Sequence, residues 1–186
     1  MLNELMAGNK RYTDGNFSDK NRDLKRRNEI ANGQHPFAAI VCCSDSRVCP
    51  EILFDQGLGD IFVVRVAGNI ADYVVIGSLE YAIEHLHVPL VMVLGHSKCG
   101  AVSATCQGGE VSGHIGHLTG KILPAVEKSR ASGHDHADEC AKENVRLVVE
   151  NLKNDSHVIS EFLNKGTLQV VGAFYDLDSG VVSTVE

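Results

Sequence analysis

The chain has 186 residues, 44% of them hydrophobic, and a formal net charge of −7, which suits one domain with a buried core at roughly 100–200 residues per domain. With no dense Lys/Arg stripe, this acidic balance argues against nucleic acid or an anionic membrane as the main partner. No apolar run approaches the roughly 18 residues of a membrane span, and with no signal peptide visible we expect a cytoplasmic protein whose six cysteines stay reduced.

Two helical patterns open the chain. Apolar side chains within residues 2–12 recur at spacings of three and four, which predicts a short amphipathic helix. A charged segment over 19–32, closed by a glycine, predicts a second helix. We therefore expect a single domain over 1–186, with an N-terminal helical arm over 1–33 and an α/β core over 34–186.

Short, uninterrupted apolar runs follow this arm. They are too short for typical helices, so we predict strands covered on both faces, as in a parallel sheet. The four runs lie at residues 37–43, 61–66, 90–94 and 168–174. A turn signal at 178–180 then predicts that 181–185 pairs back as an antiparallel edge strand.

Helical patterns lie between these runs. Their apolar faces fall within residues 76–86, 118–126 and 145–152. Strands that alternate with helices predict an α/β fold, with a mainly parallel β-sheet flanked by helices and a C-terminal antiparallel edge hairpin. The parallel strands should be joined by right-handed crossovers.

Residues that carry chemistry follow two of the predicted strands. Cys43 and Asp45 come at the end of the first run, and His96 and Cys99 follow the third. Sites in open α/β sheets form outside the carboxyl ends of the strands, so these segments would meet if the two strands are neighbours. Two thiolates and an imidazole suit zinc, and three protein ligands leave a fourth position open, as in catalytic sites.

Cys42 and Cys43 compete for the role of first ligand. Adjacent residues of a strand point to opposite faces, so the two sulfurs should not face the same ion. Cys43 is nearer the loop and lies two residues before Asp45. We therefore assign Cys43 to the metal and Cys42 to the core.

The two segments together resemble the signature of a known family. The sequence C-S-D-S-R at 43–47, followed by G-H-x-x-C-G at 95–100, is similar to the signature of the β-class carbonic anhydrases. The likeness extends over nearly the whole chain, including G-N-K-R-Y at 8–12 and G-A-F-Y-D at 172–176. It implies one zinc ion per subunit, reversible hydration of carbon dioxide to bicarbonate and a proton, and a close dimer, often built into tetramers, with its cleft at the dimer interface.

The resemblance also implies roles for individual residues. The zinc ligands would be Cys43, His96 and Cys99. Asp45, held by a bidentate pair with Arg47, would orient a zinc-bound hydroxide toward carbon dioxide. Gln34 and Gly100 would bind the substrate.

Asp45 has a second implied role. In some family members this aspartate leaves the arginine and ligates zinc itself, which makes Asp45 a conditional metal ligand. Those members hold an inhibitory bicarbonate with a Trp, an Arg and a Tyr, and the matching positions here are Ile40, Arg65 and Tyr81. The missing Trp weakens the expectation of bicarbonate inhibition of that kind.

Three alternatives differ in what the site would do. The same scaffold could hydrolyse carbonyl sulfide or carbon disulfide, which are linear like carbon dioxide. A non-catalytic, zinc-stabilised module would need a fourth protein ligand, which Asp45 could supply. A thiol redox protein ranks last, because the sequence contains no C-x-x-C.

Overall fold

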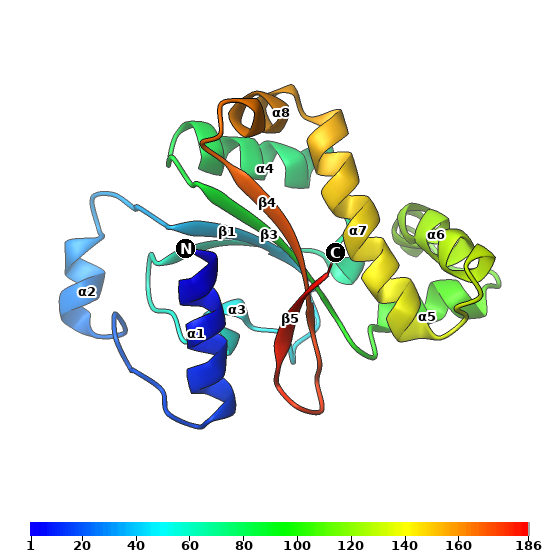
Figure 1. The fold of residues 1–186 in the computed structure, drawn as a ribbon, viewed down its shortest axis with the longest axis horizontal. Helices are drawn as coiled ribbons and strands as arrows, with labels where there is room; N and C mark the ends of the chain where they lie inside the picture. Colours follow the sequence, from blue (N-terminus) through cyan, green and yellow to red (C-terminus); the bar gives the residue numbers. More distant parts are fainter. Residues whose placement is uncertain (186) are drawn as a thin grey trace.

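The computed structural model describes residues 1–185, which form one five-stranded sheet surrounded by helices (Figure 1). The strands are β1 (Ala38–Cys42), β2 (Ile61–Arg65), β3 (Leu90–His96), β4 (Gln169–Tyr175) and β5 (Val182–Val185). The helices are α1 (Leu2–Thr13), α2 (Leu24–Glu29), α3 (Pro50–Leu53), α4 (Tyr73–Glu84), α5 (Gly100–Gln107), α6 (Ile115–Ala131), α7 (Ala137–Asp155) and α8 (His157–Asn164), with a 3₁₀ turn η1 (Ala67–Asn69). No helix in this part of the chain is both long and apolar enough to cross a membrane.

The strand order determines which loops can meet. The order is β2-β1-β3-β4-β5, and every neighbouring pair is parallel except β4 with β5. The predicted mainly parallel sheet with an antiparallel C-terminal edge pair is therefore confirmed. β1 and β3 are direct neighbours, so their carboxyl ends meet at one edge of the sheet, where ligand sites form in this class of fold.

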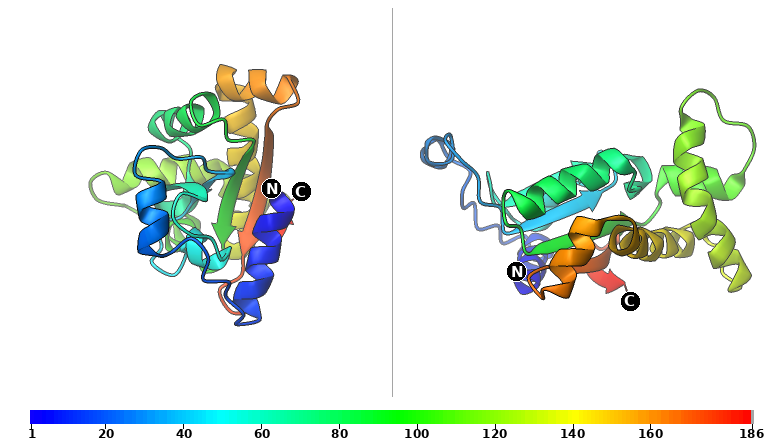
Figure 2. Two further views of the ribbon diagram at one scale, coloured as in Figure 1. Left: turned by 90° about the vertical axis from the view of Figure 1, so that its left-hand side faces the viewer. Right: turned by 90° about the horizontal axis from the view of Figure 1, so that it is seen from above.

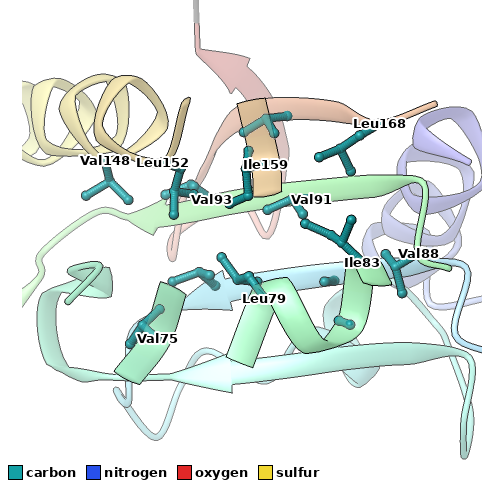
Figure 3. Close-up of a cluster of buried hydrophobic side chains, with 14 of the residues drawn as sticks. Val75, Leu79, Ile83, Val88, Val91, Val93, Val148, Leu152, Ile159 and Leu168 are labelled. Carbon is teal, nitrogen blue, oxygen red and sulfur yellow. The ribbon is translucent and has the colours of Figure 1, made fainter. Parts of the chain in front are cut away.

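Helices α4, α7 and α8 cover one face of the sheet. Figure 3 shows Leu79 and Ile83 of α4 close to Val91 and Val93 of β3, in a cluster that also contains Leu152 of α7. All five side chains are fully buried. Val91 and Val93 share this face because alternate residues of a strand point to the same side.

Helices α1 and α3 cover the opposite face. Leu5 of α1 and Leu53 of α3 pack there against Ile40 of β1 and Met92 of β3. Because both faces are covered, every residue of β1 and β3 is buried. This two-sided burial explains why the strands appear in the sequence as unbroken apolar runs.

Helices α5 and α6 lie beyond the carboxyl ends of the strands (Figures 1 and 2). They help to enclose a third cluster of buried side chains, which contains Cys43, Cys99, Val102 of α5 and Ile122 of α6. The side chains of the predicted ligands that should meet at this edge of the sheet are thus buried.

The N-terminal arm is tied to the core through a buried carboxylate. Asp55 is fully buried and accepts from Nε of Arg11 at 2.6 Å and from Nη2 of Arg22 at 3.1 Å. Close packing adds to this, since a Cβ at Gly8 would lie 1.8 Å from the carbonyl oxygen of Phe54. Helix α1 can approach α3 this closely only because residue 8 is a glycine.

The second helix is shorter than the charged segment at 19–32 predicts. Only α2 forms, because Asp19 and Asn21 have φ angles of 52° and 58°, in the left-handed region that an α-helix excludes. Asp23 then starts α2 by accepting from the backbone N–H of Arg26 at 2.8 Å. Helices α3, α5 and α8 were not predicted, since elements of four to eight residues are too short to show a helical period.

Candidate metal centre

Three buried side chains converge at the carboxyl edge of the sheet. Cys43 directly follows β1, His96 ends β3, and Cys99 is the N-cap residue of α5. One ligand atom from each residue lies within 4.8 Å of the others. Across residues 1–185, no other group of three or more His, Cys, Asp or Glu ligand atoms gathers closely enough to hold a metal ion.

The two adjacent cysteines lie on opposite sides, as the strand period predicts. Cys42 is fully buried on the face covered by α1 and α3, and this burial raises its pKa to about 12. Cys43 belongs instead to the cluster that contains Cys99. The structure therefore brings Cys43, and not Cys42, to the convergent group.

His96 presents one ring nitrogen to the two sulfurs. Its Nδ1 lies 2.8 Å from the carbonyl oxygen of Ser97, which can only accept, so Nδ1 carries the proton. Nε2 is then left with a lone pair, and it is buried without a hydrogen-bond partner in the described chain. Buried polar atoms are rarely left unpaired, and a second nitrogen fixed by a carbonyl is typical of metal-binding histidines.

The sulfur of Cys43 is surrounded by donors. The backbone N–H groups of Gly68 and Asp45 donate to it at 3.3 and 3.4 Å. The neighbouring Cys99 thiol is the main group that lowers the pKa of Cys43, and the pKa of Cys99 is raised in turn by Cys43 and by burial. The fold thus stabilises a thiolate at Cys43, the form of cysteine that binds metals.

Asp45 and Arg47 form a bidentate ion pair beside the cluster. Arg47 donates from Nε to Oδ1 at 2.9 Å and from Nη2 to Oδ2 at 2.7 Å. The guanidinium holds the pKa of Asp45 well below its usual range. Oδ2 also lies 4.0 Å from Nε2 of His96. Asp45 is therefore an ionised carboxylate next to the convergent group, with both oxygens bonded to Arg47.

The positions matched to an inhibitory bicarbonate site do not come together within one chain. Arg65 donates to the carbonyl oxygens of Asp45 at 2.7 Å and of Cys43 at 3.3 Å, so it supports the ligand loop. Ile40 is buried on the face covered by α1 and α3, whereas Tyr81 lies on α4 across the sheet. Ile40 and Tyr81 thus belong to opposite faces.

The two residues expected to bind substrate lie in different places. Gly100 is exposed and is the first residue of α5, next to Cys99. Gln34 is also exposed but precedes the amino end of β1, whereas Cys43 follows its carboxyl end. The five-residue strand between them spans roughly 16 Å at about 3.3 Å per residue. Gln34 therefore does not reach the cluster of its own chain.

The donor set fits zinc. Two sulfurs and an imidazole nitrogen are ligands that this ion prefers, and a tetrahedral ion held by three of them keeps a fourth position free. Asp45 is the nearest further ligand, but its oxygens are bonded to Arg47. The residues present therefore match a catalytic donor set more closely than a closed structural one.

Sequence reasoning missed the residues that hold the ligand loops. Gly68 donates to Cys43, and Asn144 of α7, only 2% exposed, donates to the carbonyl oxygen of Gly68 at 2.9 Å. One signal could have identified Asn144. Asn144 directly precedes Val145, the first apolar residue of a predicted helix face. A polar side chain buried at such a position needs a hydrogen-bond partner.

Comparisons of sequence identify relatives across most of the chain. The family model described as carbonic anhydrase matches residues 38–182. Carbonic anhydrase 2 of Mycobacterium tuberculosis is 42% identical over 180 residues, covering 95% of this chain and 87% of that protein. The carbonic anhydrase of Mycolicibacterium smegmatis is 42% identical over 182 residues, covering 96% of this chain and 88% of that protein.

Comparisons of structure lead to the same group of proteins. The β-carbonic anhydrase CafA of Aspergillus fumigatus aligns with a TM-score of 0.81 at 26% identity, covering all of this chain and 90% of that one. The Coccomyxa β-carbonic anhydrase, solved in complex with acetazolamide, aligns with a TM-score of 0.79 at 27% identity, covering all of this chain and 86% of that one.

Proposed function

This chain belongs to the β-class carbonic anhydrases, a family of enzymes, and from that membership we propose that it binds one zinc ion and hydrates carbon dioxide reversibly to bicarbonate and a proton. The proposed ligands are Cys43, His96 and Cys99. The observation that carries the proposal is the convergence of three buried ligand atoms within 4.8 Å, one of them an unpaired nitrogen. Soft sulfur and imidazole donors favour zinc over magnesium or calcium.

Asp45 would orient the reacting water. A bound zinc ion supplies Lewis acidity, which lowers the pKa of a coordinated water and makes a nucleophile available near neutral pH. Asp45 stays ionised because Arg47 pairs with both of its oxygens, so it can accept a hydrogen bond but not donate one. A water that donates to Asp45 must direct a lone pair elsewhere, and carbon dioxide would be attacked along that direction.

We propose that the enzyme self-associates as a dimer or a larger assembly. β2 is an edge strand, and its outer side pairs with no other strand in residues 1–185. On α4, Tyr73 is 84% exposed, Val74 60% and Tyr81 48%. Phe62 of β2 contacts Tyr81, with ring centroids 6.5 Å apart, so strand and helix share one apolar surface. An open strand edge next to exposed apolar side chains favours contact with another protein chain.

Self-association would also explain Gln34. Its side chain cannot reach the cluster of its own chain, so the implied contact with substrate requires the Gln34 of a second copy. Gly100 needs no second copy, because it lies beside Cys99 at the start of α5. The backbone N–H groups there and the helix dipole favour an anion such as bicarbonate.

Metal analysis and stopped-flow carbon dioxide hydration on the same preparation test the proposal. We expect about one zinc ion per chain, as three-ligand catalytic sites hold. We also expect activity to rise toward alkaline pH, because two thiolates offset the ion's charge and reduce the acidity of its water.

Carbonyl sulfide and carbon disulfide should be assayed side by side with carbon dioxide. Hydrolysis of either sulfur compound without carbon dioxide hydration would contradict the proposed substrate. Bound zinc with no turnover of any of the three would favour a structural site instead.

A further inference from the structure

Asn144 of α7 reaches the Cys43 segment through a single glycine. Its Nδ2 donates to the carbonyl oxygen of Gly68 at 2.9 Å, and the N–H of Gly68 donates to the sulfur of Cys43 at 3.3 Å. Gly68 has a φ of 70°, which strains any larger residue, and a Cβ there would lie 2.6 Å from Cδ1 of Ile122 and displace that side chain. Asn144 therefore fixes one side of Gly68 while the other side points its N–H at the ligand.

Asp138, in the first turn of the same helix, reaches the Cys99 segment. Its Oδ1 accepts from the backbone N–H of Lys98 at 2.7 Å. Lys98 lies between His96 and Cys99, and its φ of 55° turns the chain so that both ligands face the same point. A lysine is disfavoured in this left-handed conformation and needs support from its surroundings. Asp138 supplies such support from outside the loop.

Val145 fixes the position of α7 on the sheet. A Cβ at Gly95 would lie 2.5 Å from Cγ2 of Val145, and one at Gly172 would lie 2.8 Å from its Cγ1. The two glycines thus allow the helix to sit directly on β3 and β4, and Gly95 immediately precedes His96. Asn144 and Asp138 therefore extend from a helix whose position is fixed next to His96. Because the elements are close-packed, a displacement of α7 would be transmitted to the ligands.

We propose that α7 braces the zinc site, with Asn144 and Asp138 as positioning residues for Cys43 and Cys99. The inference rests on the proposed zinc function. Loss of the Asn144 bond frees Gly68 and weakens the N–H···S bond, which leaves the sulfur more electron-rich and less fixed. Loss of the Asp138 acceptor frees the turn at Lys98. Outer partners of metal ligands typically contribute about 10–100-fold to metal affinity.

Two variants on α7 separate positioning from stability. Asn144→Leu keeps a branched side chain of similar size but cannot donate. Val148→Ala removes buried atoms in the cluster that also contains residues of α4 and α8, away from the ligands. Both should lower the free energy of unfolding. Only Asn144→Leu should weaken zinc affinity, by about 10-fold or more, and move the thiolate-to-cobalt charge-transfer band of the cobalt-substituted enzyme to longer wavelength.

Two variants at Asp138 test the second contact. Asp138→Ala removes the acceptor for Lys98, whereas Asp138→Asn retains an acceptor oxygen. Zinc affinity, measured by competition with a chelator, should fall about 10-fold or more in the alanine variant and recover most of that loss in the asparagine variant. Because Asp138 is only half-buried in the first turn of α7, both variants should fold.

The outcomes are distinguishable. Wild-type zinc affinity and cobalt spectrum in folded Asn144→Leu, or equal affinities for the two Asp138 variants, would overturn the bracing role while leaving the proposed function intact. If Asn144→Leu does not fold, the zinc affinities of Asp138→Ala and Asp138→Asn still test the bracing role. A wild-type enzyme that takes up neither zinc nor cobalt would overturn the proposed function, and this inference with it.

Discussion

The surroundings of the Cys43 sulfur stabilise a negative charge on it. The backbone N–H groups of Gly68 and Asp45 donate to it, and the neighbouring Cys99 thiol lowers its pKa, so its charge is stabilised by groups that the fold holds in place. Cys42, its neighbour in the chain, is a buried thiol on the other face of the sheet. The two adjacent cysteines therefore differ in pKa because their side chains lie on opposite faces of the sheet.

Cys43→Ser should abolish zinc binding. A serine hydroxyl stays protonated at neutral pH and is a poor zinc ligand, so metal content should fall from about one ion per chain to near zero. Elemental analysis of the dialysed protein measures this. The matched control is Cys49→Ser, whose half-buried thiol lies outside the cluster and which should keep its metal. Full zinc occupancy in Cys43→Ser would rule out its role as a ligand.

Asp45→Asn should keep zinc and lose activity. An amide cannot form two charge-assisted bonds with Arg47, and its NH₂ group can donate toward the reacting water instead of accepting. Because a small misplacement of a reacting group can cost about 100-fold, we expect kcat/KM to fall by about that factor. Arg47→Lys should give an intermediate loss, since lysine keeps the charge without the fork. Undiminished turnover in Asp45→Asn would refute the orienting role.

At the scale of the elements, a buried carboxylate anchors the N-terminal arm to the core through ion pairs. Asp55 joins α1 and the following loop to the end of α3, through Arg11 and Arg22. Burial alone would raise the pKa of Asp55, but the hydrogen bonds from Arg11 and Ser18 outweigh it and the pKa is lowered. A carboxyl whose pKa is depressed on folding stabilises the fold above its unfolded pKa, about 3.9, and loses that contribution as the pH falls through its folded value.

Asp55→Asn should therefore destabilise the protein in a pH-dependent way. Breaking a fully buried ion pair costs roughly 3–5 kcal/mol, but the arginines here are 29% and 35% exposed, so we expect about 2 kcal/mol at pH 7. Asparagine tolerates the φ of 48° at this position, so the backbone should be retained. Urea unfolding at several pH values measures the difference from wild type. It should narrow below about pH 4, and a constant difference from pH 7 to pH 3 would contradict the assignment.

Sequence patterns predicted the elements unevenly, for physical reasons. The long parallel strands are covered on both faces, so unbroken apolar runs identify them. The left-handed residues Asp19 and Asn21 shorten α2, and nothing in their polar side chains distinguishes them from helix surface. The proposed ligands were predictable because strand ends converge in this fold. The contacts of Asn144 and Asp138 were not, since they join distant backbone groups and depend on where α7 lies.

At the scale of the whole molecule, an unpaired strand edge lies beside exposed apolar side chains. The free edge of β2 and the exposed side chains of α4 form an apolar face. Gln34 also lies far from its own cluster, at the other end of β1. Both features have a single explanation if a second copy of the chain covers this face and completes the cleft.

Tyr73→Asp combined with Val74→Asp should disrupt that assembly. The two charges would be buried without partners in the contact, which opposes association. Sedimentation velocity should show a dimer or larger species for wild type and a monomer for the double variant. Leu123→Asp, a similar change at a side chain of α6 that is 43% exposed, serves as the control and should leave assembly unchanged. A monomeric wild type, or an unaffected double variant, would contradict the proposal.

The parallel pairing of β1 with β3 has a kinetic consequence. Cys43 and His96 are far apart in the chain and become neighbours only after the intervening segment has crossed over and both strands have joined the sheet. Such non-local pairings form slowly, whereas isolated helical turns form within microseconds. During refolding, high-affinity zinc binding should therefore appear late, together with the sheet. Only chains in which β1 and β3 have paired correctly should bind the ion tightly.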